Sequence, residues 1–155
     1  MTSAETARDK LQIMSLTANS ALSEYIRLHD RLLEKQSSFW NTIKNMCGFH
    51  IPFDRLLAEV VECEKTWKFL TEEVFALDTG YRSYLGATEQ GFLDALTDYV
   101  RAVHTAVVRL KERQQLLLEV SRGDSGEGHS HADFRASHQR YEEAVRAYTE
   151  IGKRS

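Results

Sequence analysis

Apolar residues recur every three or four positions through four long stretches of this chain, which is the pattern of amphipathic helices. The first stretch begins at Thr2-Ser3-Ala4-Glu5, a sequence typical of a capping box at a helix N-terminus. It predicts one long helix reaching about residue 46, or two helices if residues 15–20 interrupt it. Its apolar positions are Leu11, Met14, Ala18, Ala21, Leu22, Tyr25, Leu28, Leu32, Phe39, Ile43 and Met46.

Glycine and proline predict where the first helix ends and the second begins. Gly48 suits the left-handed residue that follows a helix, and Pro52 suits the first turn of a new one. The chain is therefore expected to reverse between Cys47 and Pro52. The same reasoning predicts three later helices, over about 53–77, 88–120 and 132–151. Residues 81–87 are expected to form a connection in which Tyr84 and Leu85 pack against the bundle, and residues 121–131 a flexible polar loop.

These elements predict an all-α fold, with residues 1–155 forming one up-down four-helix bundle of two helical hairpins, elongated by its first helix. Residues 21–27 (ALSEYIR) and 95–101 (ALTDYVR) are near-copies in the first helix of each hairpin. They indicate one structural position used twice, and hence an internal duplication of hairpins 1–79 and 88–153. Chance similarity between helices built from few residue types is the alternative, and both interpretations stay open.

Composition and charge narrow the class of protein. A chain of 155 residues with 42% hydrophobic residues can build one ordinary core. The net charge is only −3, and the basic residues Arg109, Lys111 and Arg113 are interleaved with Glu112 and Glu119. Without a basic stripe, nucleic acid is not an expected partner.

Cysteine content and hydropathy bear on location. Cys47 and Cys63 do not make a disulfide framework, so reduced thiols are expected. The N-terminus lacks an apolar signal segment, and no stretch approaches the roughly 20 apolar residues that a membrane span needs. The sequence therefore predicts a cytoplasmic protein.

One candidate metal site follows from the predicted topology. In an up-down bundle the turn carrying Cys47 and His50 lies at the same end as the loop carrying His129 and His131, so four ligands of the type that zinc prefers would converge. Their spacing matches no established zinc signature, and histidines in polar loops are common. The expectation is no cofactor, with zinc as the alternative.

The chain offers no recognisable catalytic pattern. Glu59 and Glu62 share a helix face but lack the Glu-x-x-His pairs of a di-iron bundle, which favours a solvated acidic face. Cys63 is expected to pack as a small hydrophobe and His104 to lie at a core boundary, and no glycine-rich phosphate loop follows a strand. The sequence therefore favours a non-enzymatic protein.

Aromatic residues gather on both sides of the first turn, where core packing is the favoured interpretation. Phe39 and Trp40 cannot both face one narrow seam, because adjacent helical residues point about 100° apart. One of them is therefore expected on an exposed flank that serves as an interaction surface. The cluster comprises Phe39, Trp40, Phe49, Phe53, Trp67 and Phe69.

Two segments resemble the membrane-curving BAR modules of sorting nexins. Residues 93–101 through 109–113 are similar to one helix of such a module and residues 59–64 to another, together less than a quarter of the chain. The resemblance implies a membrane-associated dimer. A BAR module has three much longer helices and a basic concave face, which the balanced charge of the last two predicted helices does not supply.

The main hypothesis is a non-enzymatic bundle that acts by protein–protein contact, as an adaptor, chaperone-like or regulatory module, and that self-associates as a homo-oligomer. A first helix of about 45 residues would span nearly 70 Å, more than the second and fourth helices can cover, so Leu28 and Leu32 on its apolar stripe are expected to contact a partner. A bundle binding a metal or a small apolar ligand is the alternative, and membrane association a third.

Overall fold

The computed structural model describes residues 2–35, 53–121 and 131–154, and within them the fold is all-α as predicted. The first helix is observed to residue 35, and its expected continuation to residue 46 lies outside the described residues. The predicted connection over 81–87 contains a single 3-10 turn, η1 (Arg82–Tyr84). The helices are α1 (Ser3–Lys35), α3 (Phe53–Tyr81), α4 (Ala87–Ser121) and α5 (His131–Arg154).

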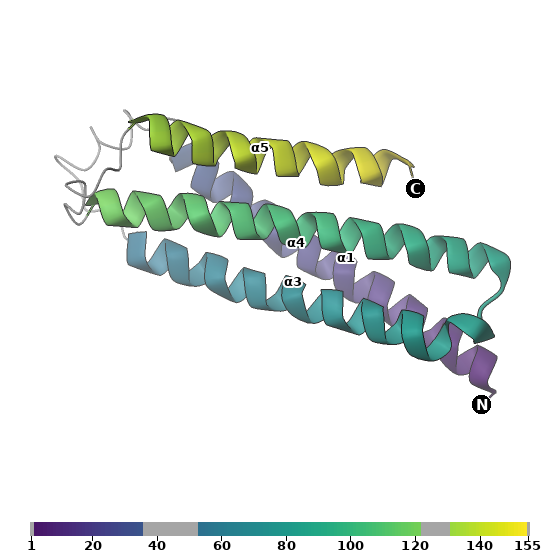
Figure 1. Cartoon of the computed structure of the whole chain (residues 1–155). Helices are drawn as coiled ribbons and strands as arrows, with labels where there is room; N and C mark the ends of the chain where they lie inside the picture. The colour runs from purple at the N-terminus through teal and green to yellow at the C-terminus, as the bar shows by residue number, and fades with distance from the viewer. Residues whose placement is uncertain (1, 36–52, 122–130, 155) are drawn as a thin grey trace.

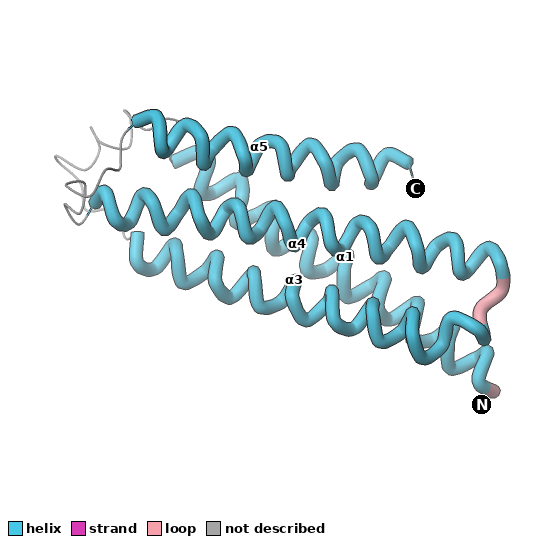
Figure 2. Tube along the Cα trace, viewed as in Figure 1, coloured by secondary structure: helices cyan, strands magenta, loops and turns pink. Residues whose placement is uncertain are grey.

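The helices form an up-down bundle. Figure 1 shows α1 and α4 running one way and α3 and α5 the other, with the end of α1, the start of α3, the end of α4 and the start of α5 at the same end of the molecule. In the view of Figure 2, α4 lies between α3 and α5 and α1 crosses behind them. The 24-residue α5 ends well short of the start of the 35-residue α4, so within the described residues the bundle has four helices at one end and three at the other.

The capping box at the N-terminus is confirmed. The backbone N–H of Glu5 donates to Oγ1 of Thr2 (3.1 Å), and the backbone N–H of Thr2 donates to Oε2 of Glu5 (2.9 Å). Two backbone donors that a helix start leaves without partners are therefore satisfied reciprocally. The local sequence alone determines where α1 begins.

Every helix carries one stripe of inward-facing residues whose spacing alternates strictly between three and four. This is the spacing of helices packed at shallow left-handed angles, in which each stripe stays against its neighbours along the whole helix. Tyr25, Trp67 and Leu110 are fully buried examples. The stripes are Ala7, Leu11, Met14, Ala18, Ala21, Tyr25, Leu28 and Leu32; Phe53, Leu56, Val60, Cys63, Trp67, Leu70, Val74 and Leu77; Leu93, Leu96, Val100, Val103, Val107, Leu110, Gln114 and Leu117; and Phe134, Ser137, Tyr141, Ala144, Tyr148 and Ile151.

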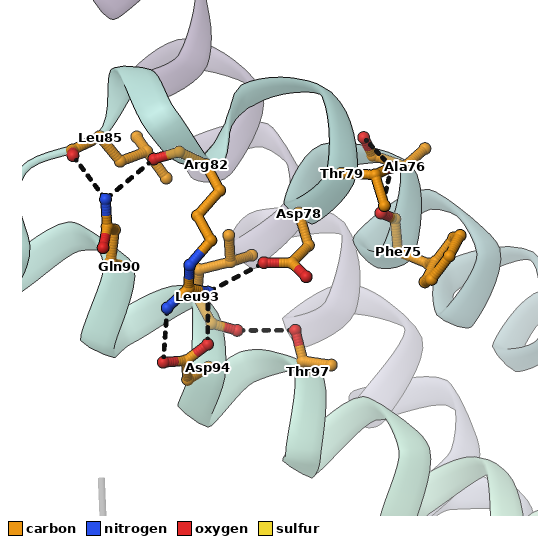
Figure 3. A network of polar contacts seen from close by, with 10 residues as sticks. All are labelled: Phe75, Ala76, Asp78, Thr79, Arg82, Leu85, Gln90, Leu93, Asp94 and Thr97. Carbon is orange, nitrogen blue, oxygen red and sulfur yellow. Dashed lines mark hydrogen bonds and ion pairs between the residues drawn. The ribbon is translucent and has the colours of Figure 1, made fainter.

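A polar network fixes the turn between α3 and α4 (Figure 3). Arg82 donates to Asp78 (2.9 Å) and reaches Asp94 with two nitrogens (2.6 and 3.1 Å). The amide of Gln90 donates to the carbonyl oxygens of Arg82 and Leu85 (both 3.0 Å), and the carbonyl oxygen of Arg82 also accepts from the backbone N–H of Leu85 (3.1 Å). The connection is thus held by local contacts. Leu85 is buried beneath it as the sequence predicts, whereas Tyr84, expected to be held with it, is 49% exposed.

The two near-identical heptapeptides do not present the same face to the core. Ile26 is 42% exposed in α1, whereas Val100 at the matching place in α4 is fully buried. Both tyrosines of the repeat nevertheless meet α5, since Tyr25 and Tyr99 each pack edge-on against Tyr148 with ring centroids about 6 Å apart. The structural equivalence expected from the sequence is therefore not seen, and the duplication itself stays a prediction.

Truncating a stripe residue should weaken the whole fold. Leu70→Ala should lower the free energy of unfolding by about 2–5 kcal/mol, because Leu70 is fully buried and the smaller side chain leaves a cavity. Thr105→Ala, on the exposed face of α4, is the control and should change it by no more than about 0.5 kcal/mol. Urea denaturation followed by circular dichroism measures both, and equal small effects would show that Leu70 is not in a packed core.

Candidate interaction site

A groove of about 430 Å³ lies between α1 and α3. Its apolar lining includes Ala21 and Leu28 from α1 and Cys63 and Trp67 from α3. Burial raises the pKa of the Cys63 thiol to about 11, and the negative charge of Glu24 adds to the rise. The thiol is therefore protonated at neutral pH and is a poor nucleophile, so the groove offers apolar contact rather than covalent chemistry.

Paired charges form the rim of this groove. Arg31 of α1 donates to Glu59 of α3, and Lys65 lies 3.0 Å from Glu62 within α3. Glu59 and Glu62 do share a face, as the sequence predicts, and both line the groove. Exposed ion pairs of this kind contribute only about 0–1 kcal/mol each to stability. Because the charges are paired, they do not give the groove a strong net charge.

The outer face of α1 carries no charge over almost four turns. Residues 11–23 contain no Asp, Glu, Lys or Arg, although 28% of the chain is charged. Ile13 and Leu16 are each 63% exposed on this stretch, together with polar Gln12, Asn19, Ser20 and Ser23. We call the exposed part of residues 11–23 the charge-free face. Protein surfaces that become buried against a partner are depleted of charge in this way.

The charge-free face is flanked by two hollows. On one side Ser15 and Asn19 line a hollow of about 190 Å³ with Phe92 of α4, which is 46% exposed because α5 ends before reaching it. On the other side Ile13 lines a hollow of about 220 Å³ with Ala76 of α3. Apolar contact area thus extends from α1 onto both neighbouring helices.

A buried cluster of aromatic hydroxyls and an imidazole joins α1 to α5. The hydroxyls of Tyr25 and Tyr141 are hydrogen-bonded at 2.6 Å, and Nδ1 of His29 is hydrogen-bonded to the hydroxyl of Tyr141. Burial raises the pKa of both tyrosines well above its usual value and lowers the pKa of His29. All three groups are therefore neutral at neutral pH, and the hydrogen bonds of this cluster join uncharged partners.

A second buried cluster centres on Arg113, which lies inside the bundle and not among the surface charges where the sequence places it. Its Nε donates to Nδ1 of His138 (3.1 Å), so the proton of that imidazole lies on Nε2, 2.9 Å from Glu142. Its guanidinium also stacks over Phe134 (5.1 Å) and donates to Gln114 (2.6 Å). Burial lowers the pKa of Arg113 to about 10, and the group stays cationic at neutral pH.

The predicted metal site cannot be placed. Cys47, His50 and His129 lie outside the described residues, and His131 is the first residue of α5, with its side chain outside the description. Among the residues that the structure describes, no three His, Cys, Asp or Glu side chains gather as metal ligands would. The zinc alternative stays a prediction.

Of the four residues expected to form an interaction surface, the structure describes Leu28 and Leu32. Leu28 is 7% exposed and Leu32 is fully buried, both in the core of the single chain, so the expectation that they contact a partner is wrong for this fold. They complete the inward stripe of α1. Phe39 and Trp40 lie outside the described residues. Sequence reasoning missed Ile13 and Leu16, although the charge-free run around them could have revealed the surface.

The residues considered for catalysis take structural positions. Cys63 is half-buried and packs against the core, as predicted. His104 is half-buried at the core boundary, also as predicted, with its Nε2 3.6 Å from Glu64. Neither residue is hydrogen-bonded to the other in any contact that the structure gives, so the nucleophile–base pair that covalent catalysis needs is not formed by these two.

Comparison with protein-family models finds no match, and comparison with curated proteins and with solved structures finds no similar chain. In the described part of the chain no helix has both the length and the apolar character to cross a membrane. Any functional conclusion therefore depends on the surface features above.

Protonation of His29 should destabilise the bundle. Burial lowers its pKa below 6.5, and its neighbours are Tyr25 and Asp30 on α1, Arg113 on α4 and His138 and Tyr141 on α5. Because the unfolded chain takes up this proton at higher pH than the folded chain, the free energy of unfolding should fall as the pH drops below about 6.5. Urea denaturation at neutral and mildly acidic pH measures this. The His29→Gln variant should lose less stability on acidification, and equal losses in both proteins would contradict the assignment.

Proposed function

We propose that this protein is a cytoplasmic, non-enzymatic helical bundle that acts by protein–protein contact, as an adaptor, chaperone-like or regulatory module. The charge-free face of α1 is the proposed contact site. The observation that carries the proposal is the exposure of Ile13 and Leu16, 63% each, within residues 11–23, the longest run without Asp, Glu, Lys or Arg in the sequence.

Contact at this face would be favourable because little opposes it. Burying the exposed parts of Ile13 and Leu16 is worth roughly 1–2 kcal/mol each. Within residues 11–23 no charged side chain would lose its hydration. The hydroxyls of Thr17 and Ser23 already donate to the carbonyl oxygens of Ile13 (2.8 Å) and Asn19 (3.3 Å), so they can leave water without losing a hydrogen bond.

Other exposed apolar residues support this choice by contrast. Phe69 (55% exposed) and Phe75 (58% exposed) each have charged residues one helical turn to both sides, whereas Leu16 has none within a turn and Ile13 has them on its N-terminal side alone. Single apolar side chains among charges are ordinary on protein surfaces. The charge-free face differs because its apolar and small polar residues are contiguous.

A photo-crosslinking residue at position 16 tests the proposal. In an extract of the source cells, the full chain carrying the crosslinker there should form a covalent adduct with a protein, and Ser20→Arg should abolish the adduct by placing a charge in the face. The same crosslinker at Thr105, exposed on α4, is the control and should form none. An unchanged adduct in the Ser20→Arg variant, or no adduct at position 16, would contradict the proposal.

The groove between α1 and α3 supports a second candidate function, binding of a small apolar ligand. Its volume of about 430 Å³ falls within the roughly 300–1,000 Å³ of ligand sites. Leu28 and Trp67 would supply apolar contact, and the paired charges at the rim would limit its exposure to water. This candidate requires a ligand of modest size without a formal charge.

Native mass spectrometry of the purified full chain tests the second candidate. A retained organic mass should be present in the wild-type protein and lost in Ala58→Trp, because Ala58 lines the groove and is exposed enough to take a larger side chain. Ala147→Trp, on the exposed face of α5, is the matched control and should keep the ligand. A bare wild-type chain, or a ligand that survives Ala58→Trp, would exclude this groove.

A further inference from the structure

The charge-free face belongs to a second stripe on α1, which points away from the core. Its members are spaced alternately by four and three residues, like the inward stripe, and all six are exposed. A helix surface with this spacing can pack along another helix over its full length. The outward stripe comprises Asp9, Ile13, Leu16, Ser20, Ser23 and Arg27.

The outward stripe is complementary to itself when reversed. Positions 9 and 27, 13 and 23, and 16 and 20 are placed symmetrically about Ala18, which lies near the middle of α1. Each pair joins unlike partners: an acid with a base at the ends, and a large apolar side chain with a serine in the two inner pairs. Such symmetry is what a two-fold interface between identical surfaces requires.

We infer that the partner at the charge-free face is a second copy of this chain, bound through antiparallel pairing of α1 with its counterpart about Ala18. This inference rests on the proposed function and names the partner for the same site. Asp9 then faces Arg27 of the other copy, and Ile13 and Leu16 fit over Ser23 and Ser20 of the other copy. In a parallel pairing Asp9 would face Asp9 and Arg27 would face Arg27, so like charges would repel.

The surroundings of the stripe favour this arrangement. Among the residues that the structure describes, no ion pair within the chain engages Asp9 or Arg27, so both charges are available to a partner. Serines opposite Ile13 and Leu16 allow the two helices to approach closely. Phe92 on α4 lines the hollow beside Ser15 and Asn19, and it would gain contact from the second copy at the edge of the pairing.

Charge reversal in the purified full chain tests the pairing. Asp9→Arg and Arg27→Asp should each weaken dimerisation about tenfold, because the two-fold symmetry turns both ion pairs into repulsive pairs at once. Mixing the two single variants should restore dimers, since every charge then faces an opposite one. The double variant should dimerise by itself. Analytical ultracentrifugation over a concentration series measures each case, with circular dichroism to verify that the variants are folded.

Several outcomes would overturn the inference. A wild-type chain that stays monomeric at all concentrations, a dimer that neither single reversal weakens, or single variants that do not recover on mixing would each exclude this pairing. The crosslink at position 16 separates this failure from failure of the proposed function. An adduct of twice the chain mass supports self-pairing, an adduct of another mass leaves protein contact standing with a different partner, and no adduct removes both.

Discussion

The buried contact between Tyr25 of α1 and Tyr141 of α5 closes the bundle, and the arrangement of the other helices depends on it. α4 packs directly against α3 and α5, and α1 packs mainly against α3. The first and last helices are joined by long aromatic side chains whose hydroxyls are hydrogen-bonded at 2.6 Å. Tyr148 adds ring contacts to Tyr25 and Tyr99, so α5 is held against α1 and α4 together. Because the tyrosine hydroxyls are neutral, the contact between α1 and α5 forms without the cost of burying a charge.

The helices could be predicted because the features that define them are local in the sequence. The capping box at Thr2 and the three-and-four spacing of apolar residues depend on neighbours in sequence. The observed helices begin and end within about four residues of the predicted bounds where both are described. The turn predicted at Gly48 and Pro52 lies outside the described residues. The stripe of α1, from Leu11 to Leu32, faces inward as its spacing indicates.

The residues whose surroundings were not predicted from the sequence are those whose neighbours come from other helices. Arg113 stands among charged neighbours in sequence, yet Phe134 and His138 from the other side of the bundle supply its surroundings. Leu28 and Leu32 belong to the apolar stripe that led to a predicted partner contact, but both are buried in the core of the single chain. Ile13 and Leu16 lie between the positions of the inward stripe of α1, so the strongest three-and-four pattern of apolar residues does not include them. The exposure of Phe92 follows from where α5 ends, and that is not encoded in the sequence around Phe92.

The two buried clusters together prevent α5 from sliding along the bundle. A shift of one repeat, seven residues, in one direction would bring Val145 to the place of His138, and the Nε of Arg113 would face an isopropyl group that cannot accept its hydrogen bond. The opposite shift would bring Phe134 to the place of Tyr141, so Tyr25 would lose its hydrogen bond at that place and Nδ1 of His29 would face a phenyl ring that cannot pair with it. Each shift leaves a buried polar group unsatisfied, at a cost of about 1–3 kcal/mol. Two polar contacts, each blocking one direction, therefore set where the last helix stops and leave the hollow beside Phe92 uncovered.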